Sequence, residues 1–507
     1  MNWSRRRKWP AVLALASMLI WVMPIAALQQ GNTSQQQKSD QTISDQVEDE
    51  LIFDQAVFAH KIDIETDQGI VQLSGNVSNL LAKKRAAKIA EAVRGVRAVV
   101  NNIEVNAVAG RTDQEIQDDV EAALLTNPAT ESFEVSSKVN DGFVNLTGTV
   151  ESWQEKQLSE KVAAGVYGVR GVNNSILVDY EADRPDSELA REVREIFKWD
   201  VFIPNDDLIT VKAVDGEIRL SGTVGSAAEK SRAYSRAWVA GVNSVDHSKL
   251  KVESWPADRR LRNDSYVDAS DPEIKEAAID AMLYDPYVNS FNVNVDVENR
   301  TVTLRGLVDN LKAKQAAERD ARNTAGVLNV NNRLKVRLLD AIPTDETVEE
   351  NVESALIRSP YVQSYEISTL VDDGKVSLYG TVDNFFEKAK AEDAAASVRG
   401  AIVVDNNIVV TNDDAPQHFD PLVDDSYYDY HWDLNTTPLE SDKEIRDDIQ
   451  SELFWSPFVD SDQVTVNVDD GTATLTGTVD SWTERDSASE NAYEGGAVFV
   501  DNDLLVK

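Results

Sequence analysis

The stretch Leu146-Thr147-Gly148-Thr149-Val150 occurs, with small changes, six times along this chain of 507 residues. A leucine stands two residues before each anchor glycine, and a valine stands two residues after it. The anchor glycines are Gly75, Gly148, Gly222, Gly306, Gly380 and Gly477. Because side chains alternate with a period of two along a β-strand, each glycine is predicted to lie within or at the end of a strand. A repeat of about seventy residues indicates one small fold copied six times.

Two elements are predicted upstream of each anchor glycine. Apolar residues at i, i+4 and i+8 predict a helix with one buried stripe. These residues are Ile43, Val47, Leu51; Ile116, Val120, Leu124; Leu189, Val193, Phe197; Ile274, Ala278, Met282; Val348, Val352, Leu356; and Ile445, Ile449, Leu453. A β-rich run and a glycine turn follow, at Gly69, Gly142, Gly216, Gly374 and Gly471, with Glu298-Asn299-Arg300 in the fourth copy. A turn of this kind between apolar runs predicts a β-hairpin.

A second helix, rich in Ala, Glu and Lys, is predicted after each anchored strand. It should end at a second glycine acting as a C-cap. These glycines are Gly95, Gly168, Gly241, Gly326, Gly400 and Gly496. A last strand is entered through Asn101, Asn174, His247, Asn332, Asn406 or Asn502. The predicted fold class is therefore α+β: six tandem αββαβ units, each with two helices on one face of a three-stranded sheet.

The pattern G-x-V, a helix, then G-V-x-x-V-x-N resembles the BON domain of bacterial envelope proteins. Copies two to four carry it most fully, as in Gly148-Thr149-Val150 with Gly168-Val169, whereas copies five and six have Ala401 and Ala497 in place of the valine. The tandem layout is similar to the OsmY-like periplasmic proteins. The resemblance implies an envelope location, phospholipid or membrane association, and in some members a role in osmotic stress or as a chaperone. It implies no catalytic residue.

The division of the chain follows from the repeats. The six BON-like units are predicted at residues 40–108, 111–180, 185–253, 271–338, 344–412 and 442–507, with linkers at 28–39, 254–270 and 413–441. Arg5-Arg6-Arg7-Lys8 and the apolar run 11–27 are typical of a secretory signal, so residues 1–27 are predicted to be a signal peptide of a periplasmic protein. The alternative is an inner-membrane anchor formed by residues 11–27. There is no cysteine, which excludes disulfides and thiol chemistry.

The charge excludes one class of partner. The chain has 50 Lys and Arg against 88 Asp and Glu, a net charge of −38, so we expect no nucleic-acid binding. The first helices are acidic, whereas the second helices hold much of the basic charge, as in Lys83, Lys84, Arg85 and Lys88. One hypothesis is that the acidic helix of one unit docks on the basic helix of another. The simpler interpretation is two solvated faces, because exposed ion pairs contribute only about 0 to 1 kcal/mol each.

Aromatic residues recur at the fifth position after the anchor glycine, as Trp153, Phe385 and Trp482. We expect them to pack back on the strand that precedes them. The alternative is contact with a membrane interface or an apolar ligand, for which amphipathic aromatics are suited.

The linkers hold two further candidates. Arg259, Arg260 and Arg262 are either a solvated cluster or a contact for lipid phosphate. The second linker has His418, Asp420, Asp424, Asp425, Asp429, His431 and Asp433, which we expect to form a tether, with a divalent-cation site as the alternative. Their spacing does not match an EF-hand, so no metal ligand is assigned.

No catalytic motif is present, and only four histidines, His60, His247, His418 and His431, are available for acid–base chemistry. We therefore expect a protein that is not an enzyme, needs no cofactor, and binds membrane phospholipid or envelope proteins through several weak contacts. A periplasmic stress chaperone is one alternative. An oligomeric envelope scaffold that self-associates through open sheet edges is another.

Overall fold

A computed structural model describes residues 39–507 except 55, 58–60, 107–109, 131–134, 181–183, 254, 256–268, 289–291, 309, 338–342, 363, 365–366, 412–440 and 457. The signal-peptide prediction, the basic cluster at 259–262 and the metal-site alternative at 418–433 lie outside the described residues. In this part of the chain, six units of the same fold follow one another, named repeats 1 to 6 below.

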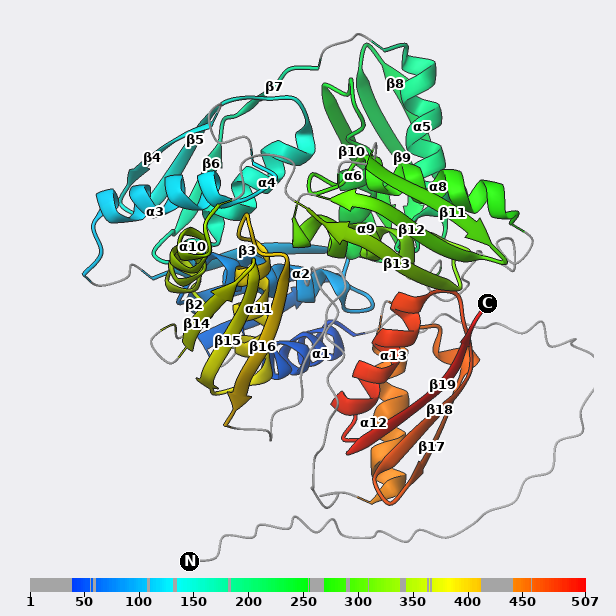
Figure 1. The fold of residues 1–507 in the computed structure, drawn as a ribbon. Helices are drawn as coiled ribbons and strands as arrows, with labels where there is room; N and C mark the ends of the chain where they lie inside the picture. The colour runs from blue at the N-terminus through cyan, green and yellow to red at the C-terminus, as the bar shows by residue number, and fades with distance from the viewer. Residues whose placement is uncertain are drawn as a thin grey trace, which may run out of the picture. The chain divides into compact units, whose positions relative to one another are not determined.

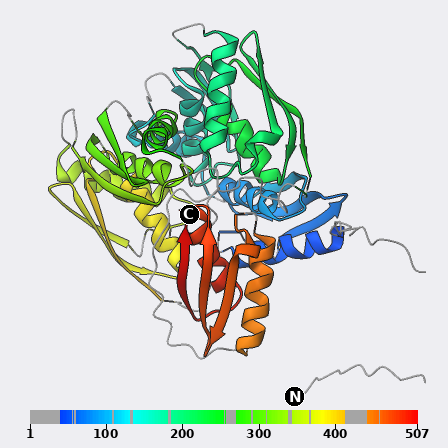
Figure 2. The ribbon, with the colours of Figure 1, turned by 90° about the vertical axis from the view of Figure 1, so that its right-hand side faces the viewer.

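Each repeat has the order helix, hairpin, helix, strand, as predicted. The first helices are α1 (Asp40–Phe53), α3 (Asp113–Thr126), α5 (Asp186–Trp199), α8 (Asp271–Leu283), α10 (Asp345–Arg358) and α12 (Asp442–Trp455). The second helices are α2 (Leu80–Ala92), α4 (Trp153–Ala164), α6 (Ala227–Arg236), α9 (Leu311–Arg322), α11 (Phe385–Ala396) and α13 (Trp482–Glu494). Figures 1 and 2 show repeat 6, orange to red, as one such unit.

The strands form one small sheet in each repeat. The hairpins are β1 (Ile62–Asp67) and β2 (Ile70–Val77), β4 (Val135–Asn140) and β5 (Phe143–Val150), β8 (Ile209–Val214) and β9 (Glu217–Val224), β11 (Val293–Glu298) and β12 (Thr301–Val308), β14 (Ile367–Asp372) and β15 (Lys375–Val382), and β17 (Val464–Asp469) and β18 (Thr472–Val479). The last strands are β3 (Ala98–Val105), β10 (Ser244–Val252), β13 (Asn329–Val336), β16 (Val403–Val410) and β19 (Phe499–Val506), while repeat 2 divides its last strand into β6 (Gly171–Asn174) and β7 (Leu177–Val178). The anchored strand is central, antiparallel to its hairpin partner and parallel to the last strand.

The predicted helix stripes form the cores. Val47 and Leu51 are completely buried and pack with Val71 and Leu73 of the central strand, and the other repeats follow the same pattern. Both helices of a repeat contact each other and cover the same face of its sheet, so the opposite face is left to solvent. The α+β prediction is confirmed.

The anchor glycines allow two backbone segments to meet. Gly222 has a φ of +122°, and a Cβ there would lie 2.0 Å from the carbonyl oxygen of Leu208. Gly306 has the same conflict with the carbonyl of Asn292, at 2.2 Å. The glycine is therefore required both by its positive φ and by the close approach of the first strand. The second glycines also have positive φ, but they lie in the turn beyond the helix: α2 is capped by Val93, two residues before Gly95.

The hairpin turn is held by the start of the first helix. In every repeat, the first helical residue is an aspartate whose carboxylate accepts both N–H groups of the turn, as Asp40 does from Gln68 and Gly69 at 2.9 Å. The other five are Asp113, Asp186, Asp271, Asp345 and Asp442. Part of the acidic charge on the first helices is therefore structural.

The recurring asparagine lies inside the last strand rather than at its entry. Asn174 Nδ2 donates to the carbonyl of Lys156 at 2.7 Å, which ties the second helix to the sheet. His247, in the equivalent place of repeat 3, instead lies beside the Tyr234 ring, 4.6 Å between centroids, where the register of β10 shifts. Burial lowers the pKa of His247. A local structural role is therefore sufficient to explain this histidine.

Candidate functional site

The residue ten positions after the first apolar residue of the first helix makes contacts between repeats in repeats 2 to 6. It is the last residue of the helix, or the next residue after it in repeat 4. We call this set the pairing position; it holds Phe53, Thr126, Trp199, Tyr284, Arg358 and Trp455. The contacts of these residues join repeat 3 with 4, repeat 2 with 5, and repeat 1 with 6.

Repeats 3 and 4 exchange their pairing residues. Trp199 packs on the core of repeat 4, and Tyr284 packs on the core of repeat 3, so the two repeats make reciprocal contacts. The N–H of Ala325 donates to the carbonyl of Trp199 at 2.9 Å, and the first helices α5 and α8 pack against each other. The hydroxyl of Tyr284 also donates to Glu192. Burial and the Glu192 charge raise the pKa of Tyr284.

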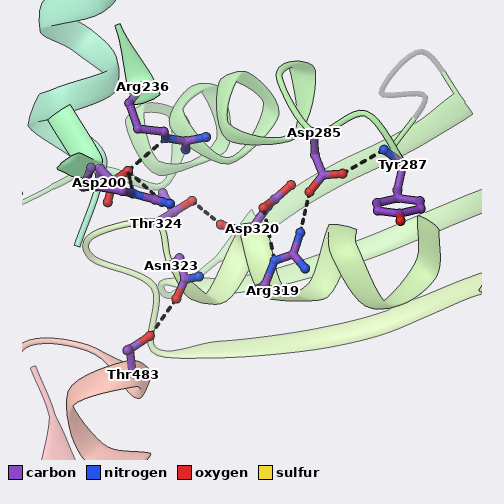
Figure 3. Close-up of polar contacts among 10 residues, drawn as sticks. Asp200, Arg236, Asp285, Tyr287, Arg319, Asp320, Asn323, Thr324 and Thr483 are labelled. Atoms are coloured by element: carbon purple, nitrogen blue, oxygen red, sulfur yellow. Dashed lines mark hydrogen bonds and ion pairs between the residues drawn. The ribbon is translucent and has the colours of Figure 1, made fainter. Parts of the chain in front are cut away.

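A network of buried charges lies at this junction (Figure 3). The Asp200 side chain is 1% exposed and accepts from Arg232 at 2.8 Å and Arg236 at 2.9 Å. These guanidinium groups hold the pKa of Asp200 below its usual range against the effect of burial. In repeat 4, Arg319 pairs with Asp285, the residue equivalent to Asp200.

Asp320 completes the network at the junction of repeats 3 and 4. Its Oδ2 atom is buried and accepts no hydrogen bond. Burial raises the pKa of Asp320 to about 7, Asp285 adds to this rise, and Arg319, Arg236 and Arg232 oppose it. An ionised carboxylate is unfavourable in such a place. The junction therefore changes charge near neutral pH.

Repeats 2 and 5 meet through the same backbone contact with different side chains. The N–H of Tyr167 donates to the carbonyl of Arg358 at 2.9 Å, and the pairing residues touch because Arg358 Nη2 lies 3.4 Å from Thr126 Oγ1. Arg358 is only 8% exposed. Burial lowers the pKa of Arg358, and the charge of Asp119 opposes this effect. Within the described residues, no carboxylate forms an ion pair with Arg358.

Repeats 1 and 6 form the third pair. Arg94 Nη1 donates to the carbonyl of Phe454 at 2.8 Å, and its guanidinium lies 4.6 Å from the centre of that ring. Trp455, at the pairing position, belongs to the buried core of repeat 1. Burial raises the pKa of Glu452 to about 8, and Glu50 and Glu494 are the next causes. This junction too carries a carboxyl group that is easily protonated.

The recurring aromatic positions make contacts with other repeats. Trp153 stacks on Trp238 of repeat 3, with 5.2 Å between the ring centroids. Trp482 donates its indole N–H to the carbonyl of Leu328 in repeat 4 at 2.8 Å, between the guanidinium groups of Arg322 and Arg485. Phe385 is half-buried at the start of α11. Trp153 and Trp482 therefore contact other repeats. Each also begins the helix that comes directly after the central strand, where we expected it to pack on that strand.

The ion pairs between repeats differ from the docking hypothesis. Lys84 of α2 pairs with Glu160 of α4 at 2.7 Å, and Lys312 of α9 pairs with Asp393 of α11. Both pairs join two second helices, and the first helices pack on first helices, as α3 does on α10. In these contacts, a first helix therefore meets a first helix and a second helix meets a second helix, whereas the hypothesis paired a first helix with a second.

Cavities lie between the repeats in the described part of the chain. One of about 190 Å³ lies between repeats 1, 3 and 6 and is lined by Arg94, Phe202 and Phe458, among other residues. A larger one of about 510 Å³ lies between repeats 1, 2, 4 and 5, next to Arg358. Within the described ranges, no group of three or more His, Asp or Glu side chains is placed to hold a metal ion. None of the helices described there is long and apolar enough to cross a bilayer.

Comparison with known proteins identifies the fold. The BON domain family matches residues 39–107, 112–180, 185–254, 270–337, 344–412 and 441–507, which together make up most of the chain. The chain belongs to the BON-domain family.

Two similar proteins illustrate the relationship. The BON chain is 33% identical over 121 residues to the osmotically-inducible protein Y of Escherichia coli (strain K12), a match that covers 23% of this chain and 60% of that protein. It is also similar to a solved structure of CdsD, a structural protein of the type III secretion system of Chlamydia trachomatis. That match has 16% identity and a TM-score of 0.12, and it covers 43% of this chain and 99% of that one. Such a score supports no argument.

Sequence reasoning missed the pairing position of the BON repeats. The signal was available: Phe53, Trp199, Tyr284 and Trp455 are large side chains just off the buried stripe of each first helix. A large aromatic at a helix end needs a partner, because burying it contributes roughly 2 kcal/mol. No local sequence pattern shows which repeat supplies the partner, because that depends on tertiary packing.

Proposed function

We propose that this BON protein works by binding rather than by catalysis. In this proposal it protects the cell envelope under osmotic stress, in the periplasm, through several weak contacts with membrane phospholipid or envelope proteins. Membership of the BON family and the similarity to osmotically-inducible protein Y support the class of function. The periplasmic location rests on the signal-like residues 1–27.

The observation that carries the proposal is the outward face of the sheet in repeat 5. Leu370, Tyr379, Val403 and Val409 lie on the three strands of this sheet and are 46% to 60% exposed. They point away from the helices, because Val371, Val376 and Leu378 supply the buried face. They share this face with Lys375, Asp405 and Asn407, and apolar side chains on an exposed sheet face are one feature of an interaction surface. Trp199, Tyr284 and Trp482 are engaged by other repeats, whereas this face is exposed and is proposed to meet a partner.

The direct test is cosedimentation of the full chain with vesicles of neutral or anionic phospholipid at low and high salt. We expect binding that is weakened by the triple change Leu370→Ser, Tyr379→Ser and Val409→Ser. Leu125→Ser is the matched control, because Leu125 is an exposed leucine on α3, away from any sheet. Equal loss in the control would show that the sheet face has no special part.

The aromatic positions give a second arm of the same test. If Trp153 and Trp482 contact the membrane, vesicles should shift their fluorescence to the blue, and the shift should be lost in Trp153→Ala/Trp482→Ala. If no vesicle binds the full chain under any condition, the membrane proposal is wrong. The exposed apolar face would then favour the chaperone alternative, in which the same side chains hold unfolded clients.

A further inference from the structure

The larger cavity has a charge opposite to that of the protein as a whole. Seven basic and two acidic side chains line it, whereas the whole chain has a net charge of −38. The basic residues are Lys84, Arg85, Lys88, Lys161, Lys312, Arg358 and Lys390. The acidic residues are Glu160 and Asp393, and each is already paired with a lysine, Lys84 and Lys312 respectively. A third carboxylate, that of Asp54, pairs with Arg85 from outside the lining, so basic side chains outnumber these acidic ones by seven to three.

These charges come from different parts of the chain and meet only in the folded protein. Lys84, Arg85 and Lys88 are on α2, Lys161 is on α4, Lys312 is on α9 and Lys390 is on α11. Like charges that are brought together repel, at a cost that grows as water is excluded. An arrangement of this kind is favourable when an anion occupies the space between the charges.

Arg358 is the clearest sign of a missing anionic partner. At the pairing position, repeats 3, 4 and 6 have an aromatic residue, whereas repeat 5 has this arginine. The residue is 8% exposed, and among the described residues the one polar contact of its side chain is the 3.4 Å approach to Thr126. Arg85, by contrast, is held by the buried carboxylate of Asp54 at 2.5 Å. A guanidinium has five N–H donors in a planar fork that matches carboxylate and phosphate oxygens.

The remaining lining limits the size and kind of the ligand. The volume of about 510 Å³ lies in the range of small-molecule sites, roughly 300 to 1,000 Å³. Thr126, Asn127, Gln157 and Tyr361 supply polar groups, and Leu81 and Val398 supply apolar contact. A macromolecule does not fit in this volume, whereas a compact solute does.

We propose that this cavity binds a small solute carrying two or more oxyanion charges, of the phosphate-ester or pyrophosphate type, with Arg358 as its principal contact. A bound anion would join repeats 1, 2, 4 and 5 and stabilise the folded chain by its binding free energy. The proposal does not depend on the membrane function above, because the cavity is separate from the outward face of the repeat 5 sheet.

The test is calorimetric titration of the full chain with pyrophosphate, with sodium acetate as the monovalent comparison. We expect binding of pyrophosphate that weakens with added salt, a rise in the melting temperature, and little response to acetate. Dihexanoyl phosphatidic acid is a second probe, which distinguishes a lipid head group from a free phosphate compound. If neither phosphate probe binds, the proposal is wrong.

Two variants locate the site. Arg358→Gln should weaken binding at least about tenfold, because a charge-assisted hydrogen bond from a buried side chain is strong. Lys88→Gln, which changes an exposed lysine of the lining, should weaken binding by a smaller factor. Lys83→Gln is the matched control: it removes the same charge from the same helix, but Lys83 does not line the cavity. Unchanged affinity in both cavity variants would overturn the proposal.

A structural role for Arg358 gives a different result. Without ligand, Arg358→Gln should melt at the same temperature as the parent chain or higher, since a buried charge with one weak contact is removed. A lower melting temperature without ligand, together with unchanged pyrophosphate affinity, would show that Arg358 only supports the junction of repeats 2 and 5.

Discussion

The junction of repeats 3 and 4 and the junction of repeats 2 and 5 use the same backbone contact but bury different side chains. In both, an N–H just before the second glycine donates to the carbonyl of a pairing residue: Ala325 to Trp199, and Tyr167 to Arg358, each at 2.9 Å. The first pair of repeats is adjacent in sequence, whereas the second is separated by two repeats. Neighbourhood in the sequence is therefore not what makes two repeats pair.

The two junctions differ in the residue that directly follows the pairing position of each repeat. It is Asp200 and Asp285 in repeats 3 and 4, but Asn127 and Ser359 in repeats 2 and 5. The two aspartates form ion pairs with arginines of the second helices. The charges at the junction of repeats 3 and 4 are therefore paired within the protein. Without these carboxylates, Arg358 faces a cavity. Neutral residues in place of two aspartates, together with Arg358 at the pairing position, thus distinguish a candidate binding site from a structural junction.

The largest expected effect is on the acidic junction. Asp200→Ala removes a buried carboxylate and leaves the half-buried Arg232 and Arg236 without their shared partner, which should cost about 3–5 kcal/mol of stability. Hydrogen exchange measured by mass spectrometry should show faster exchange around Ala325 and no change around Tyr167. The matched variant Ser359→Ala, at the equivalent place in repeat 5, should change stability by less than about 0.5 kcal/mol. Similar effects of the two variants would remove the distinction between the junctions.

The second-largest effect on stability is expected from protonation of Asp320 at the same junction. Because the pKa of Asp320 is raised to about 7, the folded chain holds a proton that the unfolded chain releases near pH 4. Stability is therefore present at low pH and is lost as pH rises towards 7, by up to about 1.4 kcal/mol per pH unit. Asp320→Asn imitates the protonated form, so its gain in melting temperature should be largest at pH 8 and small at pH 5.

The control for this pH dependence is Asp118→Asn, which changes an exposed carboxylate on α3. Its effect on the melting temperature should not vary in the same way between pH 5 and 8. A gain in Asp320→Asn that is constant over this range would contradict the assignment of the titration to Asp320.

A smaller effect is expected from the exchanged tyrosine. Tyr284→Phe keeps the ring that packs on the core of repeat 3 but removes the hydroxyl that donates to Glu192. The loss should be about 1.5–3 kcal/mol, the range of a hydrogen bond to a charged group. Glu192 keeps its ion pair with Arg184, which limits the cost. Urea denaturation monitored by tryptophan fluorescence would measure it, and no loss would mean that packing alone holds this contact.

The smallest effect should come from the polar contact next to the cavity. Tyr287→Phe removes the hydroxyl that lies 3.2 Å from Asn127 Nδ2, between repeats 4 and 2. Both groups are neutral and partly exposed, so the loss should be about 0.5–1 kcal/mol in the same urea experiment. A larger loss than in Tyr284→Phe would show that this contact between repeats 4 and 2 is stronger than the tyrosine contact between repeats 3 and 4.

Much of each repeat could be predicted because the responsible interactions are local. The stripe Ile116, Val120 and Leu124 predicted α3, and Asp141-Gly142 predicted the turn of the β4–β5 hairpin. The aspartate clamp from Asp113 to that turn was missed, since it joins residues almost thirty positions apart. The partners of Trp153 and Trp482 were missed for the same reason: Trp238 and the Leu328 carbonyl, which they contact, belong to other repeats.

The sequence by itself determined that six BON repeats of αββαβ order are present, because spacing within a helix or hairpin acts over a few residues. It also determined the excess of acid and the basic character of the second helices. Only the tertiary structure decided that repeat 3 pairs with 4, repeat 2 with 5 and repeat 1 with 6, and that Arg358 meets the lysines of three other repeats around one cavity. The physical reason is that these contacts depend on side chains at helix ends that meet across long distances in sequence, and no periodic pattern encodes which ends will meet.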